Sequence, residues 1–311
     1  MLIIITGGLG FLGSSLAKTL SKKGYKIIVL DKKKNKVFKK SKKIKVIENI
    51  DIVSLKSLNK IKIKKKNIIL HCAGQPSAAK SFDNPRNDLF SNVIGTFNLI
   101  NWAKKNHTKK IIYASTFNVY EEKISSKSLK ETHNCNPKSF YAISKLTAEN
   151  YIQVYCNFFN IKWNILRMFN IYGPGQDPKN KYLGMINIYL NMAKENSKIV
   201  VKGSLNRFRD FVFIDDVIKA WEIVIKDNKN QGQIYNVGSG KKTSVKKLIK
   251  EISVVLSKKI AVKIEKSTPG DFLGSFANIN KIKKNLNFKP CFSLKQGLKI
   301  FNKWIDEKAK Y

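Results

Sequence analysis

The sequence predicts an α/β fold in which a doubly wound parallel sheet precedes a smaller C-terminal lobe. Short apolar segments alternate with longer amphipathic stretches through the first half of the chain, as expected for buried parallel strands covered by helices. A glycine-rich turn directly follows the first apolar segment, at residues 7–13. After residue 167 the alternation loosens, and a turn rich in glycine and proline occupies residues 172–178, which indicates a second, smaller lobe.

The boundaries of these elements follow from periodicity. We predict strands at residues 2–6, 26–31, 44–48, 67–72, 111–115 and 162–167. Amphipathic helices are predicted at residues 183–195, 216–226, 244–256 and 294–305, and longer ones with apolar positions on more than one face at 87–105 and 139–159. We expect residues 1–168 to form the sheet domain, with 207–237 returning to it. Residues 169–206 and 238–311 are expected to form the smaller lobe.

The composition favours a cytoplasmic protein without a membrane or specific nucleic-acid partner. The formal net charge is +39, but lysines recur in every surface-like segment and form no single stripe, which favours a coding bias over nucleic-acid recognition. No apolar run is long enough to cross a bilayer, and no signal-like segment precedes the first predicted strand. The four cysteines and three histidines lack metal-site spacing, so no metal is expected.

Arginine is rare in this lysine-rich chain and occurs at positions 86, 167, 207 and 209. A guanidinium offers a planar fork of donors that an ammonium cannot reproduce, so retained arginines can mark sites that need bidentate geometry. Arg207 and Arg209 are therefore candidate phosphate ligands. For Arg86 we prefer chance retention or a structural ion pair.

The glycine-rich turn has the placement of a dinucleotide-binding loop. Gly7, Gly10 and Gly13 lie between the first predicted strand and a helix, where backbone N–H groups and the helix N-terminus can hold a pyrophosphate. Asp31, at the end of the second predicted strand, can accept hydrogen bonds from both hydroxyls of an adenosine ribose and would repel a 2′-phosphate. The sequence therefore predicts a Rossmann-type domain that binds NAD rather than NADP.

Two further strand ends are expected to contact the cofactor. Asp51 follows the third predicted strand, where it could reach the adenine edge or instead cap the next helix. Ala73 and Gly74 end the fourth predicted strand, and their small size leaves room for the cofactor backbone.

Tyr141 and Lys145 are the candidate catalytic pair. They lie four residues apart, which places both on one face of a helix. A phenol normally titrates at about pH 10, so it can act as a base near neutrality only when a nearby cation stabilises the phenolate. We expect Lys145 to supply that cation, and Thr116, at the end of the fifth predicted strand, to bridge substrate and phenol.

At this point the chain resembles the extended short-chain dehydrogenase/reductase superfamily, in its NAD-dependent nucleotide-sugar epimerase/dehydratase branch. The matching segments are the glycine loop, residues 92–96, the Tyr141/Lys145 pair, and residues 167–175, 209–217, 236–238 and 269–271. The resemblance implies that Asn170 and Arg209 hold the nucleotide diphosphate and that the long helices pair two subunits into a four-helix bundle. With it, the predicted cofactor-binding residues are Gly7, Gly10, Phe11, Leu12, Gly13, Asp31, Asp51, Ile52, Ala73, Gly74, Asn92, Ser115, Tyr141 and Lys145.

The residues after Thr116 help to choose among the reactions of this family. In related 4,6-dehydratases the corresponding pair is Asp-Glu, whereas this chain has Phe117 and Asn118, which can neither donate nor remove the required protons. Dehydration and decarboxylation are therefore disfavoured. We predict an NAD-dependent epimerase that inverts the C4 hydroxyl of a UDP-hexose or UDP-N-acetylhexosamine through a 4-keto sugar.

Two departures from the family pattern concern the substrate. Thr268 stands where many relatives carry an arginine, and Arg207 is expected to compensate. Ser275 stands where, by resemblance, a small residue admits an N-acetyl group. The predicted substrate-binding residues are Thr116, Asn170, Arg207, Arg209, Asp271 and Ser275.

The sequence also supports two alternative hypotheses about function. The Ala73-Gly74-Gln75 stretch also resembles C2-epimerases of CDP-deoxysugars. A non-catalytic NAD- or nucleic-acid-binding protein on the same fold is motivated by the positive charge alone.

Overall fold

The computed structural model describes residues 1–39, 41–121, 127–178, 184–266 and 273–309. The chain divides into two compact units. Unit 1 consists of Met1–Glu121, Asn134–Arg167 and Ala220–Tyr235, and unit 2 of Glu122–His133, Met168–Lys219 and Asn236–Tyr311. Each unit is described by itself below.

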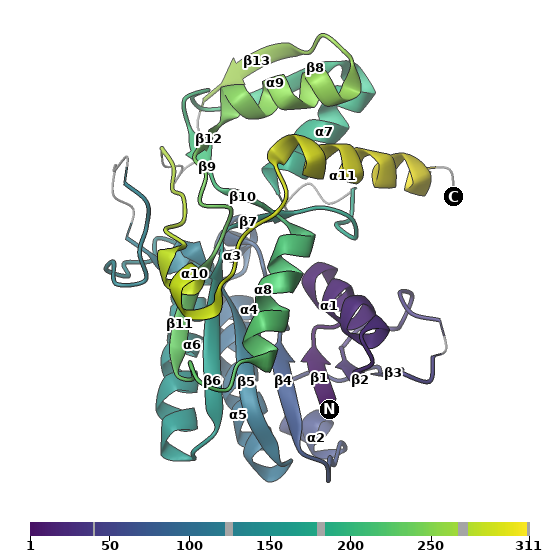
Figure 1. Ribbon diagram of the computed structural model, residues 1–311, viewed down its shortest axis with the longest axis vertical. Helices are drawn as coiled ribbons and strands as arrows, with labels where there is room; N and C mark the ends of the chain where they lie inside the picture. Colours follow the sequence, from purple (N-terminus) through teal and green to yellow (C-terminus); the bar gives the residue numbers. More distant parts are fainter. Residues whose placement is uncertain (40, 122–126, 179–183, 267–272, 310–311) are drawn as a thin grey trace. The chain divides into compact units, whose positions relative to one another are not determined.

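A seven-stranded sheet with the order β11-β6-β5-β4-β1-β2-β3 forms the centre of unit 1 (Figure 1). Its strands are β1 (Leu2–Thr6), β2 (Lys26–Leu30), β3 (Ile44–Ile47), β4 (Asn67–His71), β5 (Thr108–Thr116), β6 (Lys162–Met168) and β11 (Gln233–Val237). The pairs from β5 to β3 run parallel. The direction of strand order reverses at β1 and β4, and ligands of doubly wound sheets bind at the carboxyl ends of strands beside such a switch point. The predicted doubly wound α/β fold is therefore confirmed.

Two strands differ from the sequence-based prediction. β5 begins at Thr108, three residues before the predicted start at Ile111. The added residues include Lys110, which is buried, and its Nζ donates to the carbonyl oxygens of Val224 and Asp227. β11 was not predicted as a strand, because only part of its short sequence is apolar.

The helices of unit 1 include a long segment that is less regular than predicted. They are α1 (Phe11–Lys22), α2 (Leu55–Asn59), α3 (Ala78–Asp83), α4 (Pro85–Asp88), η1 (Leu89–Ile94), α5 (Gly95–Lys105), η2 (Phe117–Val119) and α6 (Phe140–Phe158). The helical segment predicted at residues 87–105 is confirmed, because helical residues continue from Pro85 to Lys105. A π-helical turn, η1, which was not predicted, lies within it between α4 and α5. Such a turn inserts an extra residue and commonly marks a functional site. Periodicity alone cannot reveal it, because apolar residues continue through the segment.

The core of unit 1 lies between the sheet and its helices. Ile4, Ile69, Ile111 and Ile165 come from four neighbouring strands and are fully buried. Trp102 of α5 and Ile152 of α6 pack in the same cluster. Each such side chain contributes roughly 1.5–3 kcal/mol by leaving water, so this cluster holds the strand ends in place.

Unit 2 is built from helices and short two-stranded sheets. Its elements are β7 (Asn170–Tyr172), α7 (Met185–Asn196), β8 (Lys198–Lys202), β9 (Phe208–Arg209), β10 (Phe211–Phe213), β12 (Thr243–Ser244), α9 (Val245–Leu256), β13 (Ala261–Glu265), α10 (Asn280–Leu286) and α11 (Leu294–Ala309). Helix α8 (Ile214–Lys226) contributes residues to both units. The strands pair as β7 with β10, β9 with β12 and β8 with β13. None of these strands was predicted. Four of them have only two or three residues, which carry no measurable alternation, and β8 and β13 have five residues each.

Within the ranges given above, no helix is both long and apolar enough to span a lipid bilayer.

Candidate active site

The glycine loop is shaped by backbone contacts that exclude side chains. Gly7 has φ +65°, and a Cβ atom there would lie 2.7 Å from the backbone nitrogen and Cα of Ala73. Gly10 is the N-cap of α1, so no side chain covers the first N–H groups of this helix. The loop therefore offers free backbone donors at a helix N-terminus, which fits the pyrophosphate of a dinucleotide.

Asp31 lies beside this loop. Its carboxylate accepts hydrogen bonds from the backbone nitrogen of Leu9 at 2.9 Å and from that of Lys33 at 3.0 Å. A carboxylate has about four acceptor positions, so two such bonds leave capacity for ribose hydroxyls. The described residues fit NAD in this respect. Asp31 also has a second role that the sequence did not reveal, because it holds the glycine loop through Leu9.

At the end of the third strand, the helix-cap interpretation of Asp51 is wrong. Ser54 is the N-cap of α2 and accepts a hydrogen bond from the nitrogen of Ser57, while Asp51 accepts one from the nitrogen of Val53 at 3.0 Å. Ile52 is buried and packs against Gly95 of α5. Contact between Asp51 and adenine stays a prediction.

The end of the fourth strand is held against the π-helical turn. Gly74 has φ +148°, and a Cβ atom there would collide with Oδ1 of Asn92. The same Oδ1 accepts a hydrogen bond from the nitrogen of Gln75 at 2.8 Å, and Nδ2 of Asn92 donates to Oγ of Ser144 at 2.9 Å. Asn92 therefore ties the loop after β4 to the residue before Lys145.

Two polar residues near Asn92 were missed as parts of the site. The Nε2 of Gln75 donates to both carboxylate oxygens of Asp88, each at 3.1 Å. Both side chains are buried, and burial raises the pKa of Asp88. The negative charge of Asp88 in turn raises the pKa of Tyr141. Their spacing of 13 residues gives no helical or strand period that could have indicated this pair.

The predicted catalytic residues Thr116, Tyr141 and Lys145 are all buried in unit 1. Thr116 ends β5, while Tyr141 and Lys145 lie one turn apart on α6. A hydrogen bond links Thr116 and Tyr141 and favours the phenolate, but burial is the larger effect and raises the pKa of Tyr141 to about 12. The residues of the chain thus act in the direction opposite to the one expected from sequence. Burial of the Tyr141 phenol itself, which a sequence does not display, is the main reason, and the charge of Asp88 acts in the same direction.

Lys145 is held by an aromatic ring. Its Nζ lies 4.1 Å from the centroid of the Tyr113 ring. Burial lowers the pKa of Lys145 to about 8, while Cys72 and Glu149 act in the opposite direction. Tyr113 was not predicted as a site residue, because in the sequence it is one of several apolar residues in a predicted strand.

Ser115 has a partner within the chain. Its hydroxyl donates to the carboxylate of Glu149, which also accepts from Nη2 of Arg167 at 2.7 Å. The Arg167 guanidinium stacks on Tyr120, with its Cζ 4.7 Å from the ring centroid. Contact between Ser115 and the cofactor remains a prediction. The Ser115 hydroxyl already donates a hydrogen bond to Glu149 within the chain.

His71 is a structural residue. Its Nδ1 and Nε2 lie 2.8 Å and 2.9 Å from the hydroxyl oxygens of Thr6 and Thr96, respectively. Burial and the charge of Lys145 lower the pKa of His71 to about 3, so the ring is neutral. Across the described residues, no group of three or more potential ligands is placed to bind a metal ion.

The predicted diphosphate ligands lie in unit 2. Asn170 donates from its backbone nitrogen and its Nδ2 to the carbonyl oxygen of Asp210, at 3.0 Å and 3.1 Å. Nη1 of Arg209 donates to the carbonyl oxygen of Phe208 at 2.8 Å. Nε of Arg207 donates to that of Ser204 at 3.2 Å. These contacts fix the three side chains before any ligand binds.

Asp210 organises this region, although its carboxylate was not predicted to do so. It is fully buried and accepts hydrogen bonds from Ser239, Gly240 and Ala277. It thereby joins the strand that carries Arg209 to two distant segments. The neighbouring Arg209 drew attention for its side-chain chemistry, whereas a buried aspartate has no sequence signal of its own.

Ser275 lies near Arg209 in the same unit. A bridge pairs Phe208 with Gly274, so Ser275 follows directly on the segment beside β9. Ser275 is buried, and its Oγ has no hydrogen-bond partner within the part of unit 2 that is described. Asp271 and Thr268 lie outside the described residues.

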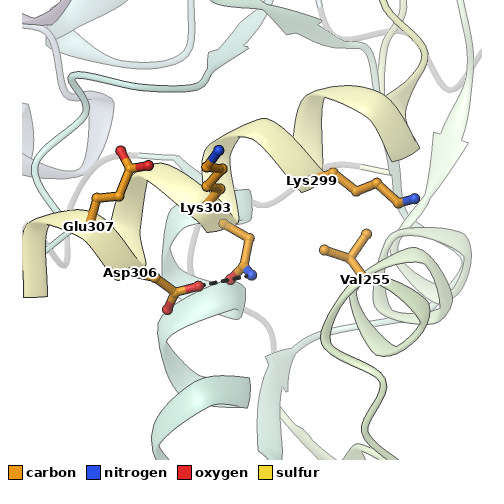
Figure 2. Close-up of a pocket in the computed structure, with 6 residues that line it drawn as sticks. Val255, Lys299, Lys303, Asp306 and Glu307 are labelled. Atoms are coloured by element: carbon orange, nitrogen blue, oxygen red, sulfur yellow. Dashed lines mark hydrogen bonds between the residues drawn. The ribbon is translucent and has the colours of Figure 1, made fainter.

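A pocket away from the predicted site is lined by other residues. Figure 2 shows this pocket of about 350 Å³, lined by Val255 of α9 and by residues of α11. There, Nδ2 of Asn302 donates to Asp306 at 3.3 Å. Lys194 also forms an ion pair with Asp306. None of the predicted cofactor or substrate residues lines it.

Comparison with known proteins places the chain among sugar-nucleotide enzymes. The model of the NAD dependent epimerase/dehydratase family matches residues 3–238. A protein of Methanocaldococcus jannaschii, to which UDP-glucose 4-epimerase activity is provisionally attributed, is 32% identical over 98% of both chains. Relatives named as dTDP-D-glucose 4,6-dehydratases match as well.

Two solved structures are similar along nearly the whole chain. The UDP-glucose 4-epimerase of Thermotoga maritima, solved with UDP-glucose, has a TM-score of 0.91 and 28% identity, covering 99% of this chain and 100% of that one. The UDP-N-acetylglucosamine 4-epimerase of Methanobrevibacter ruminantium, solved with UDP-N-acetylmuramic acid, has a TM-score of 0.90 and 28% identity, covering 98% of each.

Proposed function

Because the chain belongs to the NAD-dependent epimerase/dehydratase family, we propose that it is an epimerase that inverts the C4 hydroxyl of a UDP-sugar. The observation that carries this proposal is the hydrogen-bonded pair of Thr116 and Tyr141, followed along the chain by Lys145 one helical turn later. The glycine loop and Asp31 bind NAD, and Asn170, Arg207 and Arg209 bind the diphosphate of the substrate.

The mechanism uses Tyr141 as the base. When bound, oxidised NAD supplies a hydride acceptor and a positive charge that favours a phenolate. Tyr141 removes the proton of the C4 hydroxyl, directly or through Thr116, while C4 becomes a ketone. The keto sugar remains attached through its diphosphate and turns over. Tyr141 then returns the proton to the oxygen once C4 has been reduced on its other face, so the sugar is inverted without net oxidation.

The residues after Thr116 support epimerisation over dehydration. Dehydration requires an acid and a base that remove water from the neighbouring carbons of the sugar. Phe117 and Asn118 occupy η2, directly after the strand that carries Thr116, and neither can transfer a proton. The C2-epimerase alternative rested on the resemblance of the Ala73-Gly74-Gln75 stretch. The Gln75 amide donates to Asp88 and so offers no additional support for inversion at C2.

We further propose that the sugar carries an N-acetyl group. The buried Oγ of Ser275, which has no hydrogen-bond partner among the described residues, supports this choice, since a buried hydroxyl without a partner costs free energy that an acetamido group could recover. The similar enzyme of Methanobrevibacter ruminantium, which is named for UDP-N-acetylglucosamine, provides separate support.

Product analysis tests both statements. The purified protein should release NAD when denatured, because the cofactor is reduced and reoxidised within each turnover and does not need to dissociate. Incubated separately with UDP-N-acetylglucosamine, UDP-glucose and a CDP-deoxysugar, it should invert C4 of UDP-N-acetylglucosamine fastest. Release of water from any substrate would contradict the epimerase assignment. Equal or faster turnover of UDP-glucose would contradict only the choice of an N-acetyl sugar.

We also propose that two copies pair through α5 and α6. Exposed apolar side chains gather on these helices and on η1; they are Phe90, Ile94, Phe97, Ile143, Tyr151, Val154 and Phe158. Val154 and Phe158 are 72% and 78% exposed, and apolar side chains that gather on an exposed face commonly mark an interaction site. A second copy that presents the same face would bury it and form a four-helix bundle.

A further inference from the structure

Tyr113 and Lys145 form the closest aromatic–cation contact of the proposed catalytic region. Tyr113 lies on β5 and is the register partner of His71 on β4, and Lys145 reaches this pair from α6. The Lys145 Nζ is 4.1 Å from the centroid of the Tyr113 ring, and Tyr113 is fully buried. The same ring packs against His71, with centroids 5.1 Å apart, so it is fixed from a second side.

Glu149 is a group that brings negative charge near the Lys145 ammonium and raises the pKa of Lys145, but this charge is shared with other partners. His71 is neutral, and burial raises the pKa of the Cys72 thiol to about 12, so this thiol is also uncharged. The carboxylate of Glu149, one turn further along α6, is occupied by Arg167 and Ser115. A buried ammonium in such surroundings loses its hydration without gaining an ion pair of its own. The electron-rich face of an aromatic ring can offset part of that loss, and does so most effectively when water is excluded.

We infer that Tyr113 is a positioning residue of the reaction, whose ring keeps the Lys145 ammonium charged and in place while Tyr141 acts as the base. This inference rests on the catalytic roles proposed above for Tyr141 and Lys145. The ring stabilises only the charged form of Lys145. Without it, the ammonium loses its proton at lower pH, and the cation that is proposed to stabilise the Tyr141 phenolate is lost.

Tyr113→Leu and Tyr113→Phe distinguish a role of the aromatic ring from simple filling of the core. Tyr113→Phe keeps the ring face, and Tyr113→Leu replaces it with an aliphatic side chain. The test uses the full chain with NAD and follows epimerisation of UDP-N-acetylglucosamine and UDP-glucose against pH. For Tyr113→Leu, we expect the alkaline limb to move down by about one pH unit, which lowers kcat at pH 8 by about fivefold when the pKa of Lys145 in the parent is about 8. KM should change little. Tyr113→Phe should retain the alkaline limb of the parent.

A second measurement does not depend on activity. The Lys145 side chain can be titrated by ¹³C NMR in the folded protein, with its signal assigned by its loss in Lys145→Met. Its midpoint should be about one pH unit lower in Tyr113→Leu than in both the parent and Tyr113→Phe. If Tyr113→Leu does not fold, Tyr113→Met fills more of the space and replaces it in both experiments.

The outcomes separate the inference from the proposed function. An unchanged Lys145 midpoint and an unchanged alkaline limb in the leucine or methionine variant would show that Tyr113 only fills the core. A shift of the same size in Tyr113→Phe would assign the effect to the hydroxyl and overturn the role of the ring. Full activity of Tyr141→Phe would instead remove the proposed function, whatever the titration of Lys145 shows.

Discussion

Arg167 and Glu149 form a buried two-pronged ion pair beneath the proposed catalytic strand end. Nη2 of Arg167 donates to Oε2 of Glu149 at 2.7 Å, and Nε donates to Oε1 at 3.1 Å. The same carboxylate accepts from Ser115, the neighbour of Thr116. One ion pair therefore links β6, α6 and β5 at the level of Thr116. The geometry also explains why this position requires arginine in a chain rich in lysine, since only a guanidinium can donate in two parallel directions.

Arg167→Lys is expected to destabilise the protein although the charge is kept. A lysine cannot reproduce the paired contact, so Glu149 remains buried with poorer hydrogen bonding, and the loss should be about 3 kcal/mol. Urea unfolding followed by circular dichroism measures it. Arg86→Lys is the matched control, because Arg86 is exposed on α4, and it should change stability by less than about 0.5 kcal/mol. If the two substitutions lowered the free energy of unfolding equally, the paired contact of the Arg167 guanidinium with Glu149 would not be important for stability.

Tyr141→Phe should abolish turnover and leave binding intact. The substitution removes the proton acceptor and keeps the ring, so kcat should fall by about 10²–10⁴-fold while retained NAD and the affinity for UDP-sugars stay close to those of the parent. Single-turnover assays and calorimetry measure the two quantities. The role of the Thr116 hydroxyl can be tested with Thr116→Val, which should lower kcat less than Tyr141→Phe does. Normal epimerisation by Tyr141→Phe would remove this residue from the mechanism.

The stability of the protein should fall with acid because of His71. Its pKa is lowered to about 3 in the folded state from 6.5, so below pH 6.5 the unfolded chain binds a proton that the folded chain does not. Stability from this group is therefore present above pH 6.5 and declines as the pH falls toward 3. His71→Gln should reduce the decline between pH 6.5 and 4.5 by about 2 kcal/mol.

The exposed His107 provides the control for that experiment. It has φ +56°, a conformation that asparagine tolerates, so His107→Asn should preserve the local backbone. Its pH dependence of unfolding should match that of the parent. A parallel decline in the parent and in His71→Gln would mean that other groups cause the acid sensitivity.

Val154→Glu should separate the proposed dimer. A carboxylate on this apolar face would have to be buried in the dimer without a partner, which weakens association by several kcal/mol. Light scattering at micromolar protein should then report a monomer where the parent is dimeric. Val254→Glu on α9 introduces the same charge at another exposed valine and should leave the dimer intact. A monomeric parent would overturn the proposed pairing directly.

The order of the elements and the chemistry at the strand ends were predictable from the sequence. Apolar strands alternating with helices repeat along the chain, and the glycine loop follows β1 directly. Each of these signals lies within a few neighbouring residues, so periodicity and turn chemistry could reveal it. Tyr141 and Lys145 were recognisable for the same reason, since their four-residue spacing is itself a helical period.

Contacts between residues far apart in sequence were decided only by the tertiary structure. The ring of Tyr113 under Lys145, the Gln75–Asp88 pair, the carboxylate of Asp210 and the π-helical turn have no local period. The rise in the pKa of Tyr141 belongs to the same class, because it depends on how completely water is excluded from the folded site. The sequence alone therefore determined which groups lie at the ends of the strands and helices. Packing of distant segments decided the burial, the partners and thus the proton affinity of those groups.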